Sequence, residues 1–162
     1  MGEQLVMNRA YKIYLDVCCL NRPFDEQTQA RIRLEAEAIL EIINYCQAGI
    51  WTLINSKALE AEINQTPVRE RIKNVNSILS IAKIKVLSGE WLNERVLELQ
   101  KLGFTAYDAA HIASAERAKA NIFLTTDDRL LRKSETYSQL LEVDVSNPLQ
   151  WLAQIISTEE DR

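Results

Sequence analysis

The chain has 162 residues, of which 47% are hydrophobic and 26% are charged, so it is long enough for one domain with a real hydrophobic core. Its formal net charge of -4 argues against a protein that coats nucleic acid through bulk positive charge, although a few cations can still grip an RNA. Three cysteines without a C-x-x-C pair, together with a single histidine, exclude a disulfide framework and a zinc cage.

The apolar residues recur in two alternating patterns. Short apolar runs are typical of buried strands, and spacings of three and four residues are typical of amphipathic helices. Gly49 and Gly103 stand where two of the helices are expected to end. In chain order, the predicted elements are a strand at 11–15, a turn at Pro23 and Asp25, a helix at 27–48, a strand at 51–54, helices at 56–65 and 68–82, a strand at 84–87, helices at 88–102 and 105–120, a strand at 121–125, a short helix from 128, a weak strand at 141–145 and a last helix with Pro148 in its first turn.

This alternation of strands and helices predicts a parallel sheet, because parallel neighbours need long crossover connections. We expect an α/β fold, a three-layer α/β/α sandwich with a central, mainly parallel five-stranded sheet. No internal repeat is visible, so we expect a single domain over residues 1–162 with its core at about 11–156. In such sheets, chemistry gathers beyond the carboxyl ends of the strands.

Acidic residues stand at several of these strand ends. Carboxylates that meet at one sheet edge repel one another, and the cluster is tolerable when divalent cations neutralise it. Ligand sets made only of oxygen select hard ions such as Mg²⁺ or Mn²⁺, and a metal held in this way can activate water against a phosphodiester. The candidates are Asp16 after the first strand, Glu60 and Glu62 on the helix after the second, Asp108 in the first turn of the helix before the fourth, and Asp127 and Asp128 after the fourth.

Each acid also has a purely structural interpretation. Thr105 and Asp108 fit a capping box at the start of one helix, and Asp127 fits the N-cap of the next. Periodicity separates Glu60 from Glu62 only weakly, so both stay open. Taken singly, none of the acids is specific for metal binding, whereas their joint placement is.

Four segments of the chain carry a more specific pattern. They are IYLDVCCLN, LINSKALEAEI, GFTAYDAAHIASAERA and FLTTDDRLL. These segments resemble the PIN-domain nucleases, the family that includes the VapC-like toxin ribonucleases. The resemblance covers residues 11–131 and implies a Mg²⁺- or Mn²⁺-dependent endoribonuclease. The catalytic and metal-binding acids that it implies are Asp16, Glu62, Asp108 and Asp127.

The resemblance also implies residues that surround the metal. Asp128 is a further or substitute metal ligand, and Thr125 is expected to hydrogen-bond a metal-bound water. Many family members carry Asn or Ser two residues after the first aspartate, where this chain has Cys18. A thiol is a poorer hydrogen-bonding group, so Asn21 is the candidate that compensates.

Cations and the histidine complete the candidate set. Arg22 and Arg129 flank the strand-end acids, and we expect them to contact RNA phosphates, although arginines after turns are usually only solvated. His111 invites a general-base role. Its place within an alanine-rich helix, facing away from Asp108, favours a packed or hydrogen-bonded structural residue instead.

Other functions stay open. A catalytically degenerate PIN-like module would bind RNA or a protein partner without cutting, and the thiol at Cys18 favours that alternative. An aspartyl phosphotransferase is disfavoured, because the second aspartate expected two residues after Asp16 is missing. No Gly-rich turn supports a dinucleotide-binding fold.

The toxin resemblance implies partners as well as a substrate. A small antitoxin would cover the acidic pocket, and a homodimer is a further expectation. No apolar run reaches membrane-spanning length, and the opening MGEQLVMNRAYK lacks the apolar core of a signal peptide. We therefore expect a soluble cytoplasmic protein without membrane contact.

Overall fold

The computed structural model describes residues 9–160. The expectation that no signal peptide opens the chain concerns residues 1–8 and lies outside this range. The strands are β1 (Lys12–Leu15), β2 (Thr52–Ser56), β3 (Ile84–Val86), β4 (Ile122–Leu124) and β5 (Val145–Ser146). The helices are α1 (Val17–Asn21), α2 (Ala30–Gln47), α3 (Lys57–Ile63), α4 (Arg69–Leu79), α5 (Glu90–Lys101), α6 (Ala106–Arg117), α7 (Asp128–Thr136) and α8 (Pro148–Glu160), with two short 3-10 turns, η1 (Arg22–Phe24) and η2 (Ser138–Leu140).

All neighbouring strands run parallel, in the order β3-β2-β1-β4-β5. The chain winds from β1 through β2 to β3 on one side and then crosses over to place β4 and β5 on the other. The direction of winding therefore reverses between β1 and β4, and the crevice at such a reversal is where open α/β sheets bind ligands. Leu15 pairs with Leu124 at the last step of the register, so Asp16 and Thr125 leave the sheet side by side.

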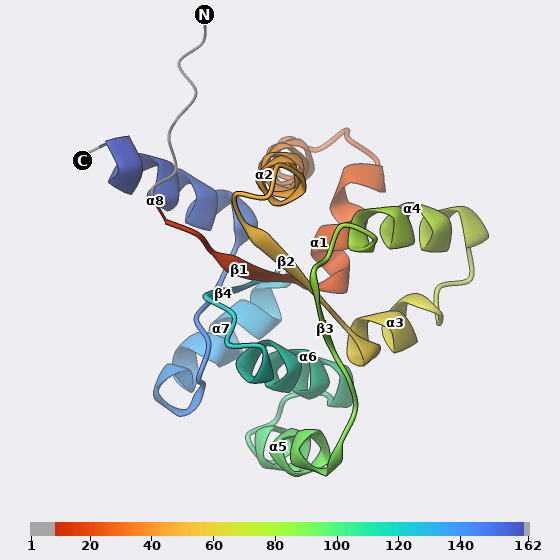
Figure 1. Cartoon of the computed structure of the whole chain (residues 1–162), viewed down its shortest axis with the longest axis vertical. Coiled ribbons are helices and arrows are strands. Elements are labelled where there is room, and N and C mark those ends of the chain that lie inside the picture. Colours follow the sequence, from red (N-terminus) through yellow and green to blue (C-terminus); the bar gives the residue numbers. More distant parts are fainter. Residues whose placement is uncertain (1–8, 161–162) are drawn as a thin grey trace, which may run out of the picture.

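Helices cover both faces of the sheet (Figure 1). α2 packs against α8 on one face, with α1 and α4 beside them, and α6 covers the other face, flanked by α3 and α7. α5 packs on the outer side of α6. This three-layer arrangement around an all-parallel five-stranded sheet confirms the predicted fold class.

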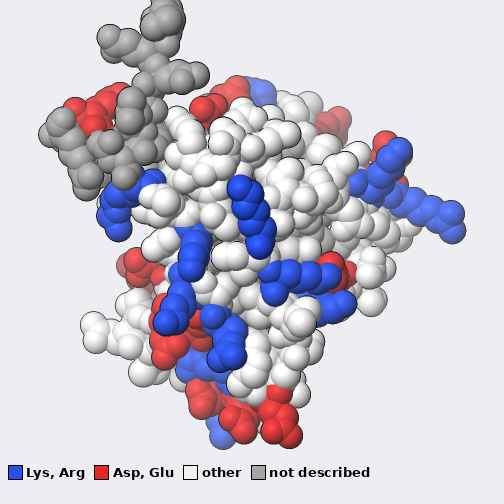
Figure 2. All heavy atoms as spheres, in the orientation of Figure 1, with Lys and Arg blue, Asp and Glu red and all other residues white. Residues whose placement is uncertain are grey.

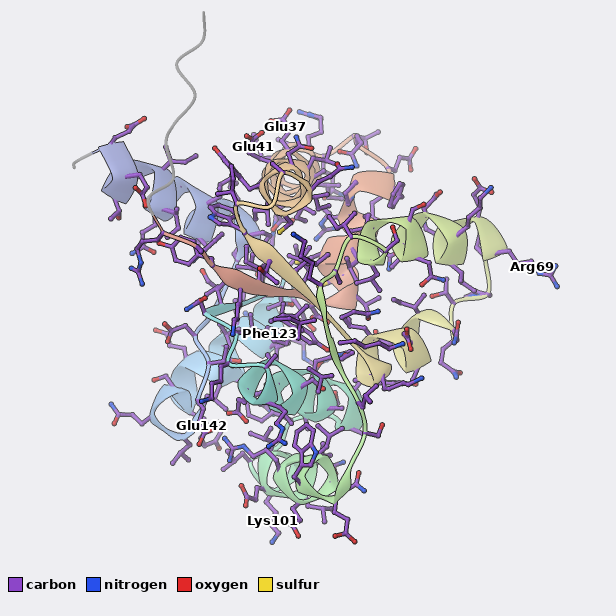
Figure 3. All side chains as sticks on the ribbon, viewed as in Figure 1. Glu37, Glu41, Arg69, Lys101, Phe123 and Glu142 are labelled. Carbon is purple, nitrogen blue, oxygen red and sulfur yellow. The ribbon has the colours of Figure 1, made fainter. Side chains whose placement is uncertain are left out.

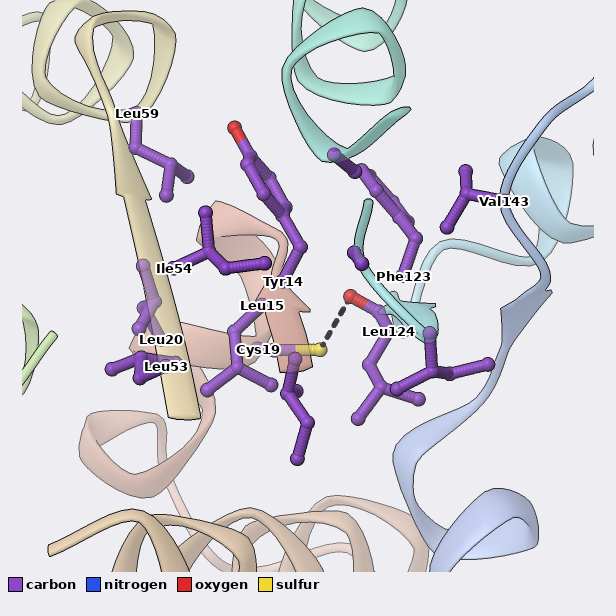
Figure 4. Packing of buried hydrophobic residues seen from close by; sticks show 14 of the residues in the cluster. Tyr14, Leu15, Cys19, Leu20, Leu53, Ile54, Leu59, Phe123, Leu124 and Val143 are labelled. Carbon is purple, nitrogen blue, oxygen red and sulfur yellow. Dashed lines mark hydrogen bonds between the residues drawn. The ribbon is translucent and has the colours of Figure 1, made fainter. Parts of the chain in front are cut away.

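The central strands are buried on both faces, as expected for a parallel sheet between two helical layers. Tyr14 and Phe123 point toward α6 and stack with their ring centroids 5.2 Å apart (Figure 4). Leu15 and Leu124, the next residues along each strand, point toward α2. Figure 3 places Phe123 in the middle of the molecule and Glu37 on the outer side of α2. The strand sequences thus fix which side chains face the two helical layers.

Most ends of the predicted elements differ from the structure by one to three residues, and larger differences lie around the first and fifth strands. Residues 17–21, for which no element was predicted, form α1, a short helix that the side chain of Asp16 caps, and the turn predicted at Pro23 and Asp25 contains η1. The fifth strand is two residues long and lies at Val145–Ser146 instead of 141–145. Leu141 and Val143, whose apolar pattern suggested the longer strand, pack against the core from a loop.

The two helix stops were predicted correctly. Gly49 and Gly103 follow the ends of α2 and α5 with φ values of 80° and 101°, in the left-handed region that glycine adopts without strain.

The surface carries both signs of charge. Figure 2 shows basic side chains across the middle of one face and acidic side chains at its lower end, over α5. Basic side chains thus gather on part of this face although the formal net charge is -4. Within residues 9–160, no helix is long and apolar enough to cross a membrane.

Candidate metal centre

Asp16 lies at the carboxyl end of β1 and is 6% exposed. Its Oδ1 accepts a hydrogen bond from the backbone N–H of Val17 at 2.8 Å, which caps α1. Its Oδ2 accepts from the hydroxyl of Thr125 at 2.8 Å and from the thiol of Cys18 at 3.4 Å. Three donors from two segments therefore hold this buried carboxylate in one orientation.

Thr125 and Cys18 join the ends of β1 and β4. The Thr125 hydroxyl also accepts the backbone N–H of Asp127 at 3.1 Å, and Cys18 Sγ accepts the N–H of Thr126 at 3.3 Å. Sγ and the Thr125 hydroxyl lie 3.3 Å apart. The structure thus places Cys18 beside Asp16, at the position where the family resemblance implies a polar supporting side chain.

Asp127 has the capping role that the sequence also allowed. Its Oδ1 accepts the backbone N–H groups of Arg129 at 2.9 Å and Leu130 at 3.4 Å and so starts α7. Thr105 begins α6 in a similar way, because its hydroxyl accepts the backbone N–H of Asp108 at 3.1 Å. The N-cap at Asp127 and the cap by Thr105 are thus confirmed, and the contact at α6 leaves the Asp108 carboxylate outside the cap.

The charge of Asp108 interacts with those of the other acids. Burial raises the pKa of this half-buried carboxyl, and the negative charges of Asp16 and Asp127 raise it further. Carboxylates far apart in the sequence therefore come within electrostatic reach of one another at the end of β1 and β4. Their mutual repulsion is relieved by a bound proton or cation.

Glu62 reaches the same place from α3. Its Oε1 lies 2.7 Å from Nε2 of His111, a residue of α6 that is fully buried. On its other side, the ring nitrogen Nδ1 of His111 lies 2.7 Å from the hydroxyl of Tyr14 in β1. His111 is thus hydrogen-bonded and packed, as favoured from the sequence, but it points toward the acids and was not predicted to contact Glu62.

These donors suit a metal ion. One ligand atom from each of Asp16, Glu62 and His111 lies within 4.8 Å of the other two. The charges of Asp108 and Asp127 act on the same region. Carboxylate oxygens favour hard divalent cations, and such an ion would neutralise the repulsion that raises the pKa of Asp108. The ligand atoms of Asp16, Glu62 and His111 therefore lie close enough together for a single ion to contact them.

Glu60, the other candidate on α3, has different partners. Its carboxylate pairs with Lys85 at 2.9 Å and Lys57 at 3.6 Å, and the hydrogen bond from Lys85 lowers its pKa. Of the two glutamates, Glu62 is the one that lies beside His111 and near Asp16.

Asp128 is paired with an arginine. Both of its carboxylate oxygens accept hydrogen bonds from the guanidinium of Arg31 in α2, at 2.8 and 2.9 Å, and this contact lowers its pKa. Arg31 also donates to the carbonyl of Thr126 at 3.2 Å. The structure therefore gives Asp128 a role in fixing the β4–α7 loop, and its role as a metal ligand stays only a prediction.

Two more predicted residues contact other partners. Arg22 approaches the buried Glu35, with 3.1 Å between Nε and Oε1 in an ion pair that lacks an aligned hydrogen bond, and also pairs with Asp25 at 3.2 Å. Asn21 accepts hydrogen bonds from Arg71 at its backbone and side-chain oxygens, at 3.1 and 3.3 Å. Neither contact is directed at Asp16, so both residues support the loop rather than the carboxylate.

Arg129 is exposed and lines a small cavity of about 120 Å³ together with Asp108, Asp127 and Lys133. In this cavity the basic side chains of Arg129 and Lys133 lie next to the carboxylates of Asp108 and Asp127. This arrangement suits an anionic ligand that a bound metal ion separates from the carboxylates. A larger hollow of about 730 Å³ lies beside β5 and α8, and none of the four predicted acids lines it.

The fold of this chain is similar to those of two solved structures. No protein-family model and no curated protein sequence matches the chain. The structure of PAE2754 from Pyrobaculum aerophilum superposes with a TM-score of 0.55 and 17% identity, over 92% of this chain and 99% of that one. The structure of VapBC2 from Rickettsia felis bound to a DNA fragment from their promoter gives a TM-score of 0.53 and 14% identity, over 84% and 98%.

These likenesses extend over most of both chains. At identities below 20% they show a shared fold and leave the activity to be argued from the site.

Proposed function

We propose that this chain is a metal-dependent endoribonuclease of the PIN kind, in which Asp16, Glu62, Asp108 and Asp127 hold Mg²⁺ or Mn²⁺. The observation that carries the proposal is the fixed carboxylate of Asp16, buried at the reversal point of the sheet with other acids within electrostatic reach. The four segments that resemble PIN nucleases and the fold shared with VapBC2 support it.

The chain's own residues have separable tasks in this reaction. A divalent ion supplies positive charge that polarises the phosphodiester and activates water. Thr125 and Val17 orient Asp16 before the ion binds. The carboxylates of the four proposed acids supply oxygen ligands, which select a hard cation. Arg129 and Lys133, beside the cavity next to Asp108, are placed to attract a phosphate of the RNA.

The same proposal extends to a toxin role with an antitoxin partner that covers the acids. The likeness to VapBC2 and the VapC-like segments support this extension. A gene for a small DNA-binding or disordered protein next to the gene for this chain would favour it. A chain without such a neighbour would instead be a solitary nuclease, with the metal site unchanged.

Removing the metal tests the nuclease proposal directly. The purified protein should cleave a mixture of single-stranded and structured RNAs in Mn²⁺ or Mg²⁺, stop in EDTA and recover when excess Mn²⁺ is added, as followed on denaturing gels. Equal cleavage in EDTA would contradict a metal-dependent reaction. Mn²⁺ or RNA binding without cleavage of any RNA would favour the catalytically degenerate module.

Cys18 is expected to support metal binding through Asp16. Replacing Cys18 with Ala removes the thiol that donates to Oδ2 and should weaken Mn²⁺ binding about tenfold, the low end for residues behind a metal ligand, because a thiol is a weak donor. Cys18→Ser keeps a donor and should bind at least as tightly as the original chain.

Calorimetric titration of Mn²⁺ measures these affinities. Cys46→Ala is the matched control, since Cys46 is a buried thiol on α2 whose pKa burial raises to about 12. Unchanged binding in Cys18→Ala would mean that Thr125 and Val17 alone hold Asp16.

A further inference from the structure

Four side chains form a continuous hydrogen-bonded chain that ends on Glu62. The hydroxyls of Ser56 and Tyr14 lie 2.7 Å apart, Tyr14 lies 2.7 Å from Nδ1 of His111, and Nε2 of His111 lies 2.7 Å from Glu62. Ser56, Tyr14 and His111 are all fully buried. The residues come from β2, β1, α6 and α3, so tertiary packing assembles the chain.

With Glu62 ionised and His111 neutral, the chemistry of each group sets the direction of these bonds. An ionised carboxylate only accepts, so Nε2 of His111 carries the hydrogen that bonds to Glu62. In a neutral imidazole the other nitrogen, Nδ1, is then an acceptor, and the Tyr14 hydroxyl donates to it. Ser56 donates to Tyr14 and itself accepts the backbone N–H of Leu59 at 3.0 Å. The hydroxyls of Ser56 and Tyr14 and both ring nitrogens of His111 are satisfied in this arrangement.

Glu62 depends on this contact more than Asp16 depends on any one donor. Within residues 9–160, His111 is the only side chain that donates to the Glu62 carboxylate, which is 30% exposed near the end of a seven-residue helix. Asp16, in contrast, is held by three donors. A glutamate side chain has three rotatable bonds, so the Glu62 carboxylate stays near Asp16 only when a hydrogen-bond partner holds it.

We propose that His111 is a positioning residue that holds the Glu62 carboxylate for metal binding, and that Tyr14 and Ser56 keep its Nε2–H directed at Glu62. This inference rests on the proposed metal site and assigns a role within it. Residues that orient metal ligands from behind contribute about 10- to 100-fold to metal affinity.

His111 also lies close enough to act as a ligand itself, since its nitrogen belongs to the group of donor atoms within 4.8 Å. That role requires Nε2 to lose its hydrogen and the bonds to Tyr14 and Ser56 to reverse. The two roles therefore differ in whether the Nε2–H survives when the metal binds.

The test combines metal affinity with nitrogen NMR. His111→Leu should weaken Mn²⁺ binding about 10- to 100-fold in calorimetry, and His111→Gln, whose amide can still donate to Glu62, should recover most of the loss. Tyr14→Phe, which removes only the hydroxyl, should weaken binding less and should alter the His111 tautomer. The control is Tyr11→Phe, a buried tyrosine next to the same strand whose ring packs against Trp51 and Trp151, and it should bind Mn²⁺ normally.

The chain has a single histidine, so its ¹H–¹⁵N spectrum belongs to His111 alone. The spectrum should show the Nε2–H form without metal and keep it after Mg²⁺ is added. Loss of the Nε2–H signal with Mg²⁺ would make the imidazole a ligand and overturn the positioning role. Normal Mn²⁺ binding by folded His111→Leu and Tyr14→Phe would overturn it too.

Failure of the inference differs from failure of the proposed function. If the original chain binds Mn²⁺ and Asp16→Asn does not, the metal site stands whatever the His111 variants do. If the original chain binds no Mn²⁺, both the metal site and the positioning role are wrong.

Discussion

Replacing Asp108 with Asn is expected to abolish metal-dependent RNA cleavage and to make the metal-free protein more stable. Burial and the charges of Asp16 and Asp127 raise the pKa of Asp108, which means that its ionised form is unfavourable in the folded chain. Asparagine has the same size and no charge. Its backbone N–H still donates to Thr105, so α6 keeps its start.

Loss of the bound metal ion should cost at least about 3 kcal/mol of transition-state stabilisation, which corresponds to a loss of activity of about 100-fold or more. Asp16→Asn should lose activity to the same extent. Asparagine still suits the N-cap of α1, so this variant should also fold. Unchanged cleavage in both variants would remove the proposed mechanism.

The gain in stability should depend on pH. Because the folded pKa of Asp108 lies above the unfolded one, the folded state holds its proton more tightly, and the contribution of this group to stability falls as pH rises between the two values. Asp108→Asn removes that fall. Thermal unfolding in EDTA should therefore show the largest difference above the folded pKa, and a lower melting temperature for the variant at neutral pH would contradict this electrostatic account.

Glu35→Gln is expected to lower the free energy of unfolding by about 3 kcal/mol, the low end for removing one partner of a buried ion pair. Glu35 is 1% exposed and pairs with Arg22 and Arg31 while accepting a hydrogen bond from Asn147 at 2.7 Å. Arg22 is largely buried and would keep only Asp25, at 3.2 Å, as a charged partner. Arg31 is half exposed and keeps Asp128, so it adds little.

Urea unfolding measures this loss. Glu37→Gln is the matched control, because Glu37 lies on the outer side of the same helix (Figure 3) and should change stability by less than about 0.5 kcal/mol. A loss below about 1 kcal/mol for Glu35→Gln would mean that water or a rearranged Arg22 compensates the missing charge.

The fold could be predicted from the sequence because its signals are local and periodic. Apolar runs such as 11–15 and 121–125 located the strands of the reversal point, and Gly49 and Gly103 located helix ends. The parallel order then follows from the need for helical crossovers. The fifth strand was predicted several residues too early, because apolar side chains of the preceding loop pack into the core as those of a strand do.

The acids at strand ends were also predictable, since a parallel sheet gathers them at one edge. Their contacts were not. Asp128 with Arg31 and Tyr14 with His111 are each separated by 97 residues, and the pairing depends on how side chains of different layers meet. For the same reason, the ion pair of Arg22 with Glu35 could not be predicted from the sequence.

The most direct test of the central claim is a calorimetric titration of Mn²⁺ into the metal-free protein and two matched variants. The chain should bind one or two ions saturably, Asp16→Asn should lose at least tenfold in affinity, on the order expected for a disrupted metal site, and Asp128→Asn should bind normally because its carboxylate is held by Arg31. No binding by the original chain, or equal binding by Asp16→Asn, would contradict a metal centre at the ends of β1 and β4.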